Sequence, residues 1–525
     1  MMTDPQGRGQ APRALLSFAV AALVLALAGT RLHRSPYVAS NLSVVPDTVE
    51  YAVCAQRFAT LGVYDLPIDG VSYPPHSPPW FSTVFLSPAY FAAPDELGAG
   101  IVVVLAFALA GVLAAFLIGR RLAGEWGGAA AAVALAANGV YRTYSREIMT
   151  DVPAVALALW AWWLFARIRE RERPLREWAL AGILCAAAQA IRSESLALYL
   201  PFAWAAWRAR ERLLPPLLAL GIPCAAVLVA TGLYHHATFG DFRRTGYQFW
   251  TPVPWDYREL LFSTAYLGQN LRAWIEPWIL PALALGVAGT GVLALRREQE
   301  LRPALGFLAF AAGIPSLAHL VFFFTAARFH LPAIAGLCVL GGAGVAALVP
   351  ARVRHRLPAL AIAIPWLLLA LPSRPDDPPV RRIVADVLAA ETSADAVIVS
   401  GIDPVCLEPI VLRGTSRRIV PVSRNVEYAS KAVAWNRIPR LDPPPSGPLD
   451  HRAPGLFVGG AMDVIEFTAD EAPDRLAEIV RSGRLVYVES MYVPAGFSLR
   501  GLLGRDLVAE PHPEHRWLAR LRLRE

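Results

Sequence analysis

A succession of apolar stretches, each long enough to cross a membrane, occupies the first 370 residues and constrains the fold of this chain more than any other feature. A membrane-spanning helix needs about 20 predominantly apolar residues. The whole chain is 55% hydrophobic and 17% charged, whereas soluble domains carry about 25% charged residues. These properties predict a mainly α fold built on a polytopic transmembrane domain.

The arginines between the stretches predict the orientation of this domain. By the length criterion there are about eleven candidate spans, at residues 14–32, 98–118, 124–140, 152–167, 178–191, 194–207, 213–233, 277–295, 303–324, 330–349 and 357–371. Basic connections mark the cytoplasmic side of a membrane protein. They occur at every second connection, at 120–121, 167–176, 208–212, 296–302 and 351–356. We therefore expect a multi-pass protein of a bacterial-type inner membrane with a cytoplasmic N-terminus and an exported C-terminal segment.

The net charge of +7 has the same explanation. Basic proteins often bind nucleic acid, but here the arginines cluster between apolar stretches, where they set topology. We therefore expect membrane lipids, and no nucleic acid, among the partners.

The composition changes after Leu371, where proline and charge replace apolar residues. Residues 373–379 predict a linker between a transmembrane catalytic domain (1–372), which carries an exported loop (33–97), and an exported soluble domain (380–525). In the soluble domain we predict strands at 396–401, 417–422, 455–460 and 484–490 and helices at 380–392 and 469–483. This alternation predicts a small α/β fold with parallel strand pairs.

The exported loop contains an acidic residue, Asp47, directly before a predicted amphipathic helix from Thr48 to Leu61. A carboxylate fixed at a membrane face can take a proton from a hydroxyl, which makes Asp47 a candidate general base. Alternatively, Asp47 is only the N-cap of the helix, because aspartate accepts hydrogen bonds from the first helical amides. Glu50 is expected to be a capping-box partner or a helper of the base.

The same loop contains the proline-rich segment YPPHSPPW at residues 73–80. Proline fixes φ and removes a hydrogen-bond donor, so this segment is stiff and not helical. A stiff segment suits a platform for a substrate, on which His76 would meet a phosphate. The alternative is a turn that re-enters the membrane and carries a solvated histidine.

A second acidic residue, Asp151, stands where a predicted span begins. Asp151 either starts the helix or faces the same cavity as Asp47, where it would shape acceptor binding or hold a divalent metal. Arg146 would pair with either acid. His235 and His236 would form a metal pair only with a carboxylate from elsewhere in the chain.

Two arginines, Arg192 and Arg328, stand at the exported ends of predicted spans. The planar guanidinium group suits a phosphate, although an arginine at such a position also snorkels to lipid headgroups. Ionisable residues at membrane depth tend to mark function, and here they collect on the exported side: Asp47, Glu50, His76, Arg146, Asp151, Arg192, Glu194, Arg328 and His330. We expect these residues to converge on one pocket around Asp47.

In the order of these motifs, residues 14–350 resemble the GT-C superfamily of membrane glycosyltransferases, and in particular its protein O-mannosyltransferase and aminoarabinose-transferase branch. In the exported loop the matching residues are Asp47, Glu50, Tyr51, Gly62, Gly70, Tyr73, Pro78 and Pro79. The segment SREIMTDVPAVAL resembles the second acidic motif of the family, with Asp151 at the acidic position. The segment ARFHLPAIAGLCVL resembles its late Arg-aromatic-x-Leu-Pro segment, which places Arg328 near a donor phosphate.

This resemblance implies transfer of a hexose or pentose from a polyprenyl-phosphate donor to a hydroxyl of a lipid, glycan or protein acceptor, on the exported face and with inversion. Asp47 and Asp151 would be the catalytic residues. The substrates would be bound by Glu50, Tyr73, His76, Arg146, Arg192, Arg328 and His330. No cofactor is implied with certainty, and a requirement for a divalent metal stays open.

The chain departs from the aminoarabinose-transferase branch at two positions. It has Ser77, with His76 beside it, where that branch has a lysine before its Pro-Pro pair, and it has Arg192 where that branch has a second lysine. The identity of the donor sugar therefore cannot be carried over.

Two other classes of protein share some of these features. A non-enzymatic lipid or glycan transporter would also need polar residues within the membrane, but transporters tend to show internal repeats, and the sequence has none. A structural or regulatory membrane protein would not need acids and arginines clustered on one face.

Overall fold

The computed structural model describes residues 45–68, 71–169, 174–208, 213–250, 255, 261–274, 279–324, 326–349, 380–402, 404–421, 472–491 and 503–525. The chain divides into two compact units, each of which is described by itself. The helical unit comprises Met1–Val38, Ile101–Ala230 and Tyr266–Asp376, and the mixed unit comprises Ala39–Gly100, Thr231–Ala265 and Asp377–Glu525. Several predicted features lie outside the described residues, namely the spans at 14–32 and 357–371, Gly70, the linker at 373–379 and the strand at 455–460.

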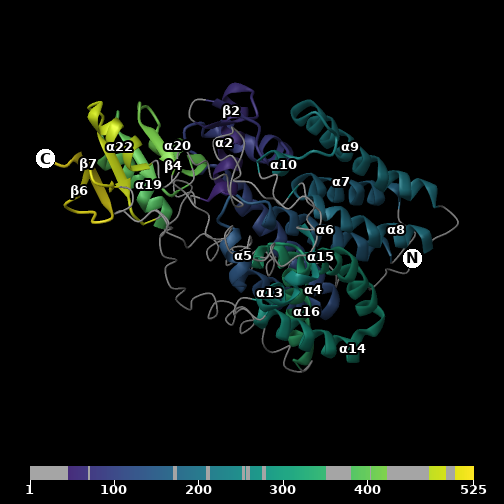
Figure 1. The fold of residues 1–525 in the computed structure, drawn as a ribbon. Coiled ribbons are helices and arrows are strands. Elements are labelled where there is room, and N and C mark those ends of the chain that lie inside the picture. The colour runs from purple at the N-terminus through teal and green to yellow at the C-terminus, as the bar shows by residue number, and fades with distance from the viewer. Residues whose placement is uncertain are drawn as a thin grey trace, which may run out of the picture. The chain divides into compact units, whose positions relative to one another are not determined.

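Helices form the helical unit (Figure 1). Its elements are α4 (Gly100–Ala137), α5 (Gly139–Tyr144), α6 (Asp151–Ile168), α7 (Leu175–Ile191), η3 (Ser193–Leu198), α8 (Tyr199–Arg208), most of α9 (Leu214–Phe239), α13 (Leu267–Ala273), α14 (Leu280–Leu308), η6 (Ala309–Gly313), α15 (Ile314–Leu320), η7 (Ala327–His330) and α16 (Leu331–Leu348). The end of α9 and the start of η5 (Thr264–Tyr266) belong to the mixed unit. Among the described residues, five helical stretches are long and apolar enough to cross a membrane: Gly100–Ala137, Asp151–Ile168, Leu214–Phe239, Gln299–Leu320 and Ala327–Leu348. The chain is therefore a multi-pass membrane protein, while the count of about eleven spans stays a prediction.

Helix α4 contains a break that separates two of the predicted spans. Ala123 and Gly124 have non-helical backbone angles, and Gly124 has a φ of 76°, a conformation that favours glycine. A Cβ added to Gly119 would lie 2.4 Å from the carbonyl oxygen of Gly127, so the segments before and after the break pack backbone to backbone. The predicted spans at 98–118 and 124–140 are therefore the two arms of α4.

Small residues also allow α14 and α16 to approach each other closely. A Cβ on Gly344 would lie 2.2 Å from the Cα of Gly289, a contact typical of helix packing in membranes. One expectation is not met here, because α14 is helical throughout 296–302, where the sequence predicted a connection. Arginine, glutamate, glutamine and leucine are all good helix formers, so the charge in this segment does not interrupt the helix.

The mixed unit combines the exported loop with a sheet. In the loop lie α2 (Pro46–Leu61), β1 (Leu66–Ile68), β2 (Val71–Tyr73), η2 (Phe81–Leu86) and α3 (Ser87–Ala92), followed much later by α10 (Gly246–Trp250). The C-terminal part contains α19 (Val380–Glu391), β3 (Val397–Ser400), α20 (Pro404–Val411), β4 (Arg418–Pro421), α22 (Ala472–Arg481), β5 (Val486–Glu489), β6 (Leu507–Pro511) and β7 (Leu518–Leu523). Within this unit α20 contacts α2 and β1, and Arg413 forms a hydrogen bond with Asp95.

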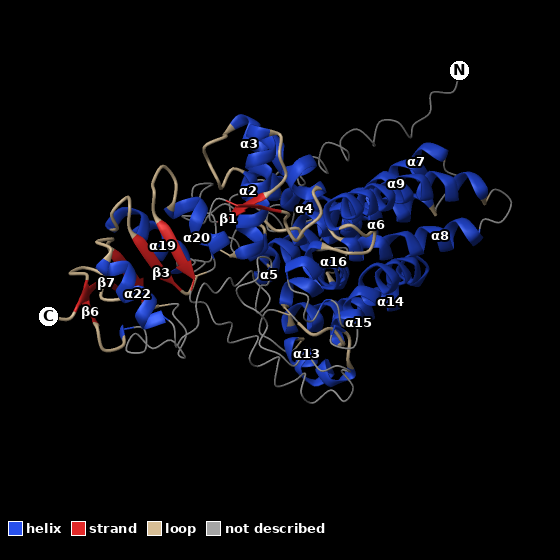
Figure 2. Ribbon diagram, turned by 45° about the horizontal axis from the view of Figure 1, so that its top comes forward, coloured by secondary structure: helices blue, strands red, loops and turns tan. Residues whose placement is uncertain are grey.

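The C-terminal part is a layered α/β fold (Figure 2). Its five strands have the order β4-β3-β5-β7-β6, with parallel pairs around β3 and antiparallel pairs around β7. Val397 and Val399 point to the face covered by α22, whereas Ile398 points to the face covered by α19 and α20. The α/β layering and the parallel pairs agree with the prediction, while a separate soluble domain at 380–525 stays a prediction. The sequence did not predict α20, β6 or β7.

Candidate functional site

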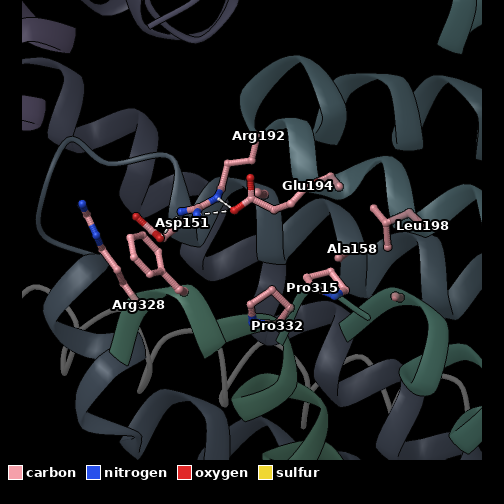
Figure 3. A pocket seen from close by; sticks show the side chains of 12 residues that line it. Asp151, Ala158, Arg192, Glu194, Leu198, Pro315, Arg328 and Pro332 are labelled. Atoms are coloured by element: carbon pink, nitrogen blue, oxygen red, sulfur yellow. Dashed lines mark hydrogen bonds and ion pairs between the residues drawn. The ribbon is translucent and has the colours of Figure 1, made fainter. Parts of the chain in front are cut away.

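The predicted site residues fall into two groups, one in each unit. The helical unit contains a small, partly open pocket, here called the Asp151 pocket (Figure 3). It is lined by Asp151, Ala154, Ala158, Arg192, Glu194, Ser195, Leu198, Ala311, Pro315, Arg328, Phe329 and Pro332. The pocket therefore unites four of the residues that were expected to converge, Asp151, Arg192, Glu194 and Arg328.

Arg192 lies between two carboxylates in this pocket (Figure 3). It connects α7 to η3, and its guanidinium forms ion pairs with Asp151 and with Glu194. The Nε donates to Oε1 of Glu194 over 2.6 Å. The side chain of Asp151 is 2% exposed and that of Glu194 is 32% exposed. Asp151 is the first residue of α6, which confirms the helix-start interpretation. Its carboxylate binds Arg192.

The second arginine, Arg328, lies in η7, and its contacts include a thioether and an aromatic ring. Its Nη1 lies 3.5 Å from the sulfur of Met149. Its Cζ lies 5.3 Å from the centre of the Phe329 ring, and the Cζ of Arg192 lies 5.7 Å from the centre of the same ring. Both distances are within the range of cation–π attraction, so one aromatic ring helps to hold two cations at one pocket.

The pocket combines fixed charges with apolar walls. Two guanidiniums and two carboxylates line it together with aliphatic and proline side chains such as Ala158, Leu198 and Pro332. The charge of Arg192 is balanced by its two carboxylate partners, whereas the described contacts of Arg328 include a thioether and a ring.

Two further predicted residues, His330 and Arg146, also belong to the helical unit. His330 is fully buried, and its ring centre lies 4.7 Å from that of Trp274. Arg146 is half-buried in the turn between α5 and α6. Their contacts with a substrate stay a prediction.

In the mixed unit, Asp47 lies within a helix and does not cap it. Helix α2 begins at Pro46, its N-cap is Val45, and no side chain forms a capping hydrogen bond. The N-cap interpretation of Asp47 is therefore wrong, because Pro46 occupies the first helical position and the helix begins before Asp47. The Asp47 side chain is 30% exposed, so a hydroxyl can reach it.

Glu50 holds the proline-rich segment against α2. Its side chain is 1% exposed. It accepts hydrogen bonds from the backbone amides of His76 and Ser77, each with a donor–acceptor distance of 3.2 Å. It also pairs with Nδ1 of the His76 ring. The capping-box role of Glu50 is therefore wrong, since its partners lie in the loop. The predicted helix is also not amphipathic in its first half, because residues 48–55 are all buried.

His76 lies between the two acids of α2. Its Nε2 lies 3.7 Å from Oδ1 of Asp47, while its Nδ1 contacts Glu50. The His76 side chain is 10% exposed, and its ring meets that of Tyr247 edge-on with the centres 4.6 Å apart. The alternative of a solvated histidine is therefore wrong. Tyr73 lies in β2, opposite Leu66 of β1.

The proline-rich segment is non-helical from Pro74 to Pro79, as predicted. The hydroxyl of Tyr64 donates to the carbonyl oxygens of Ser77 and Pro78, over 2.9 and 3.2 Å. The segment also packs tightly against Gly246, where an added Cβ would lie 2.4 Å from the Cα of His76. These contacts fix His76 from both sides.

The described part of the chain contains no group of three or more His, Cys, Asp or Glu side chains that could hold a metal ion. The ring of His236 stacks on Phe242, and His235 packs beside Tyr234 and Phe239. Asp151 is occupied by Arg192.

Sequence reasoning did not single out three residues that shape these groups. Phe329 supports both arginines, Met149 contacts Arg328, and Gly246 leaves room for His76. Of these three residues, only Phe329 could have been found from the sequence, because it is the aromatic residue between Arg328 and His330. Nothing in the sequence marks Met149 or Gly246, since their roles come from contacts between distant segments.

Comparison with known proteins places this geometry in context. Residues 76–235 match the family model of dolichyl-phosphate-mannose-protein mannosyltransferases, a segment that begins at His76 and includes Asp151 and Arg192. A search of curated protein sequences gave no match.

Solved structures resemble the chain over most of its length. ArnT from Cupriavidus metallidurans in the apo state has a TM-score of 0.54 and 12% identity, with 98% of both chains covered. The same protein bound to undecaprenyl phosphate has a TM-score of 0.54 and 13% identity, with 97% of both chains covered. AglB, an oligosaccharyltransferase from Archaeoglobus fulgidus in complex with an inhibitory peptide and a dolichol-phosphate, has a TM-score of 0.52 and 12% identity, with 95% of this chain and 73% of that chain covered. These likenesses confirm the GT-C fold that the motifs indicated.

Proposed function

We propose that this chain, which has the GT-C fold of membrane glycosyltransferases, moves a sugar from a polyprenyl-phosphate donor to an acceptor hydroxyl on the exported face of a bacterial-type inner membrane. The observation that carries this proposal is the Asp151 pocket, where two guanidiniums flank one ring within apolar walls. Such a pocket suits a phosphate that is attached to a lipid. ArnT, which binds undecaprenyl phosphate in one of its structures, supports this class of ligand.

On the donor side, the reaction needs stabilised negative charge more than it needs an acid. The bond between the sugar C1 and the phosphate oxygen breaks with its electrons going to the phosphate, which leaves as a stable anion. Fixed cations in a site of low dielectric constant stabilise that developing charge. Arg328 would bind the phosphate directly, and Arg192 would support it from within its ion pairs. Asp151 then acts by orienting Arg192.

On the acceptor side, the reaction needs one base. A hydroxyl gains nucleophilicity when a positioned carboxylate takes its proton, and Asp47 is partly exposed at the start of α2. A single displacement by this hydroxyl would invert the configuration at C1. This scheme accommodates a hexose or a pentose as the sugar and a lipid, a glycan or a protein as the acceptor.

The donor half of the proposal is tested by ligand binding. Undecaprenyl phosphate would be titrated into the purified protein in nanodiscs, with Arg328→Ala compared with the unaltered chain. A hydrogen bond to a charged group is worth about 1.5–3 kcal/mol, so the Kd should rise by roughly 10- to 150-fold. Equal affinity in both proteins would overturn the role of Arg328.

Arg481→Ala is the matched control for this experiment. Arg481 lies on α22 and its ion pair with Asp506 is about half exposed. The Arg481→Ala variant removes the same charge from the chain without altering the Asp151 pocket, so the Kd should not change. A similar loss of affinity in this control would mean that net charge, and not the pocket, governs binding.

A further inference from the structure

Glu50, His76 and Asp47 form a continuous line of ionisable groups in the mixed unit. The two acids lie in the first turns of α2, and His76 reaches between them from the proline-rich segment. The line begins at a side chain that is 1% exposed, Glu50, and ends at one that is 30% exposed, Asp47. It therefore connects a buried carboxylate to a carboxylate that an acceptor can reach.

The contacts of Glu50 assign the tautomer of His76. Glu50 accepts hydrogen bonds from two backbone amides, one on each carboxylate oxygen. An ionised carboxylate only accepts hydrogen bonds, so Nδ1 of His76 carries the proton that lies between them. In the neutral ring with this tautomer, Nε2 has the free lone pair, and Nε2 lies 3.7 Å from Oδ1 of Asp47 and 3.4 Å from the hydroxyl oxygen of Ser77.

The position of His76 is set by rigid neighbours. The ring of Tyr247 packs edge-on against it, the backbone of Gly246 meets its Cα, and the prolines on either side restrict its backbone. A histidine that only served as a flexible surface contact would need none of these supports. A buried carboxylate that orients an imidazole and stabilises its cation is the arrangement by which acid–histidine pairs accept protons in enzymes.

We propose that His76 is a relay that receives the acceptor proton from Asp47, with Glu50 as the residue that orients the ring and stabilises its cation. This inference rests on the proposed function. The acceptor O–H bond breaks as its oxygen bonds to C1, the proton passes to Asp47, and the C1–phosphate bond breaks with its electrons going to the phosphate. The proton then moves from Asp47 to Nε2 of His76, which leaves the imidazolium beside Glu50 and restores the base. The imidazolium finally releases the proton to water.

The groups around His76 favour a cation at this position. Asp47 and Glu50 face the ring from α2, and the remaining ionisable neighbours, such as Tyr51 and Tyr247, are neutral at physiological pH. The described arginine of α2, Arg57, is paired with Asp65. An imidazole is ordinarily a stronger base than a carboxylate, so transfer of a proton from a carboxylic acid to a neutral imidazole is favourable. Turnover should therefore fall when His76 is already protonated.

The test is a pH profile of turnover by purified protein in proteoliposomes. Undecaprenyl-phosphate hexoses and pentoses serve as donors, and a lipid and glycan extract of a bacterial cell envelope serves as the source of acceptors. The unaltered chain should lose kcat below a pH near the pKa of an imidazole. His76→Asn keeps an amide that can donate to Glu50 but cannot relay, so kcat should fall by about 10²- to 10⁴-fold. The fall of kcat at low pH, here called the acidic limb, should be absent from the profile of this variant, while the KM for the donor should not change.

Two further variants separate a relay from a structural role. Glu50→Gln should move the acidic limb of kcat to lower pH, because the imidazolium loses its anionic partner. His236→Asn removes an exposed histidine of the same unit that stacks on Phe242, and it should leave the profile unchanged. A His76→Asn protein with an unchanged acidic limb, or with a raised KM for the donor and normal kcat, would overturn the relay.

The outcomes also distinguish the relay from the proposed function. If the unaltered chain transfers sugar and His76→Asn does so at full rate, the relay is wrong and the proposed function stands. If the unaltered chain transfers no sugar from any donor of the panel, the proposed function itself fails.

Discussion

At the scale of single residues, the surroundings of a charge decide its role more than its identity does. The sequence marked Arg192 and Arg328 as equivalent candidates for binding a phosphate. In the structure Arg192 is held by two carboxylates, whereas Arg328 contacts a thioether and a ring. The sequence could place both arginines at span ends, but it could not predict their partners, because these come from distant segments.

The two partners of Arg192 should differ in their effect on stability. Removal of one partner of a buried ion pair costs about 3–5 kcal/mol, and Asp151 is 2% exposed. Asp151→Asn should therefore lower the free energy of unfolding by an amount near that range. Glu194 is 32% exposed, so Glu194→Gln should cost about 1 kcal/mol. Thermal unfolding in detergent measures both, and equal losses would contradict this ranking.

A surface ion pair of the exported loop gives a pH-dependent prediction. Arg57 donates to Asp65 over 2.5 and 2.9 Å, and Ser72 also donates to it. Burial alone raises the pKa of Asp65, but these hydrogen bonds and the charge of Arg57 outweigh burial and bring the pKa below its ordinary value of 3.8. A lowered pKa stabilises the folded state above the ordinary value, and this stability is lost as the pH falls through the folded pKa.

Asp65→Asn should therefore be less stable than the unaltered chain at pH 7, by about 1 kcal/mol. The difference should shrink as the pH falls through the lowered pKa of Asp65, and it should disappear once the carboxylate is protonated in both the folded and unfolded states. Unfolding curves at a series of pH values test this. A difference that stays constant with pH would show that the charge of Asp65 contributes nothing.

At the scale of elements, patterns that depend on local sequence were predictable, and contacts between segments were not. Periodicity and composition located α6, α19, α22 and most strands of the sheet to within a few residues. The predicted start of α2 is wrong. Aspartate is a good N-cap, but the first helical residue is Pro46, which precedes Asp47. Charge alone also predicted a connection within α14 where the helix continues.

The contact between α10 and the proline-rich segment can be tested by one methyl group. A Cβ on Gly246 would lie 2.4 Å from the Cα of His76 and 2.5 Å from the carbonyl oxygen of Pro75. Gly246→Ala should therefore displace the segment, cost about 1–3 kcal/mol and lower kcat. A Cβ on Gly221 in α9 meets nothing within 4 Å, so Gly221→Ala should leave kcat unchanged. Equal activity of the two variants would contradict the packing of His76.

At the scale of the whole molecule, apolar stretches and the spacing of arginines were enough to predict a multi-pass membrane protein with a C-terminal α/β fold. The order of the motifs was enough to indicate the GT-C fold, which the solved structures confirm. The sequence could not group the exported loop with the C-terminal segment in one compact unit. That grouping depends on contacts such as the one between α2 and α20, which link residues far apart in the chain.

The orientation of the chain follows from its basic connections and can be measured directly. Alkaline phosphatase is active only outside the cytoplasm, so its fusion after Glu525 should be active if the C-terminal segment is exported. A fusion within the basic connection at 208–212 should be inactive. The reverse pattern would place the Asp47 loop on the cytoplasmic side and remove it from the proposed acceptor face.

The most direct test of the account is the turnover of Asp47→Asn with undecaprenyl-phosphate sugars. We expect kcat to fall by about 10²- to 10⁴-fold, with the Kd for undecaprenyl phosphate and the unfolding temperature unchanged. Asp95→Asn, which alters an 88% exposed carboxylate of the same unit, should keep normal turnover. Near-normal kcat in Asp47→Asn would contradict the assignment of this carboxylate as the base.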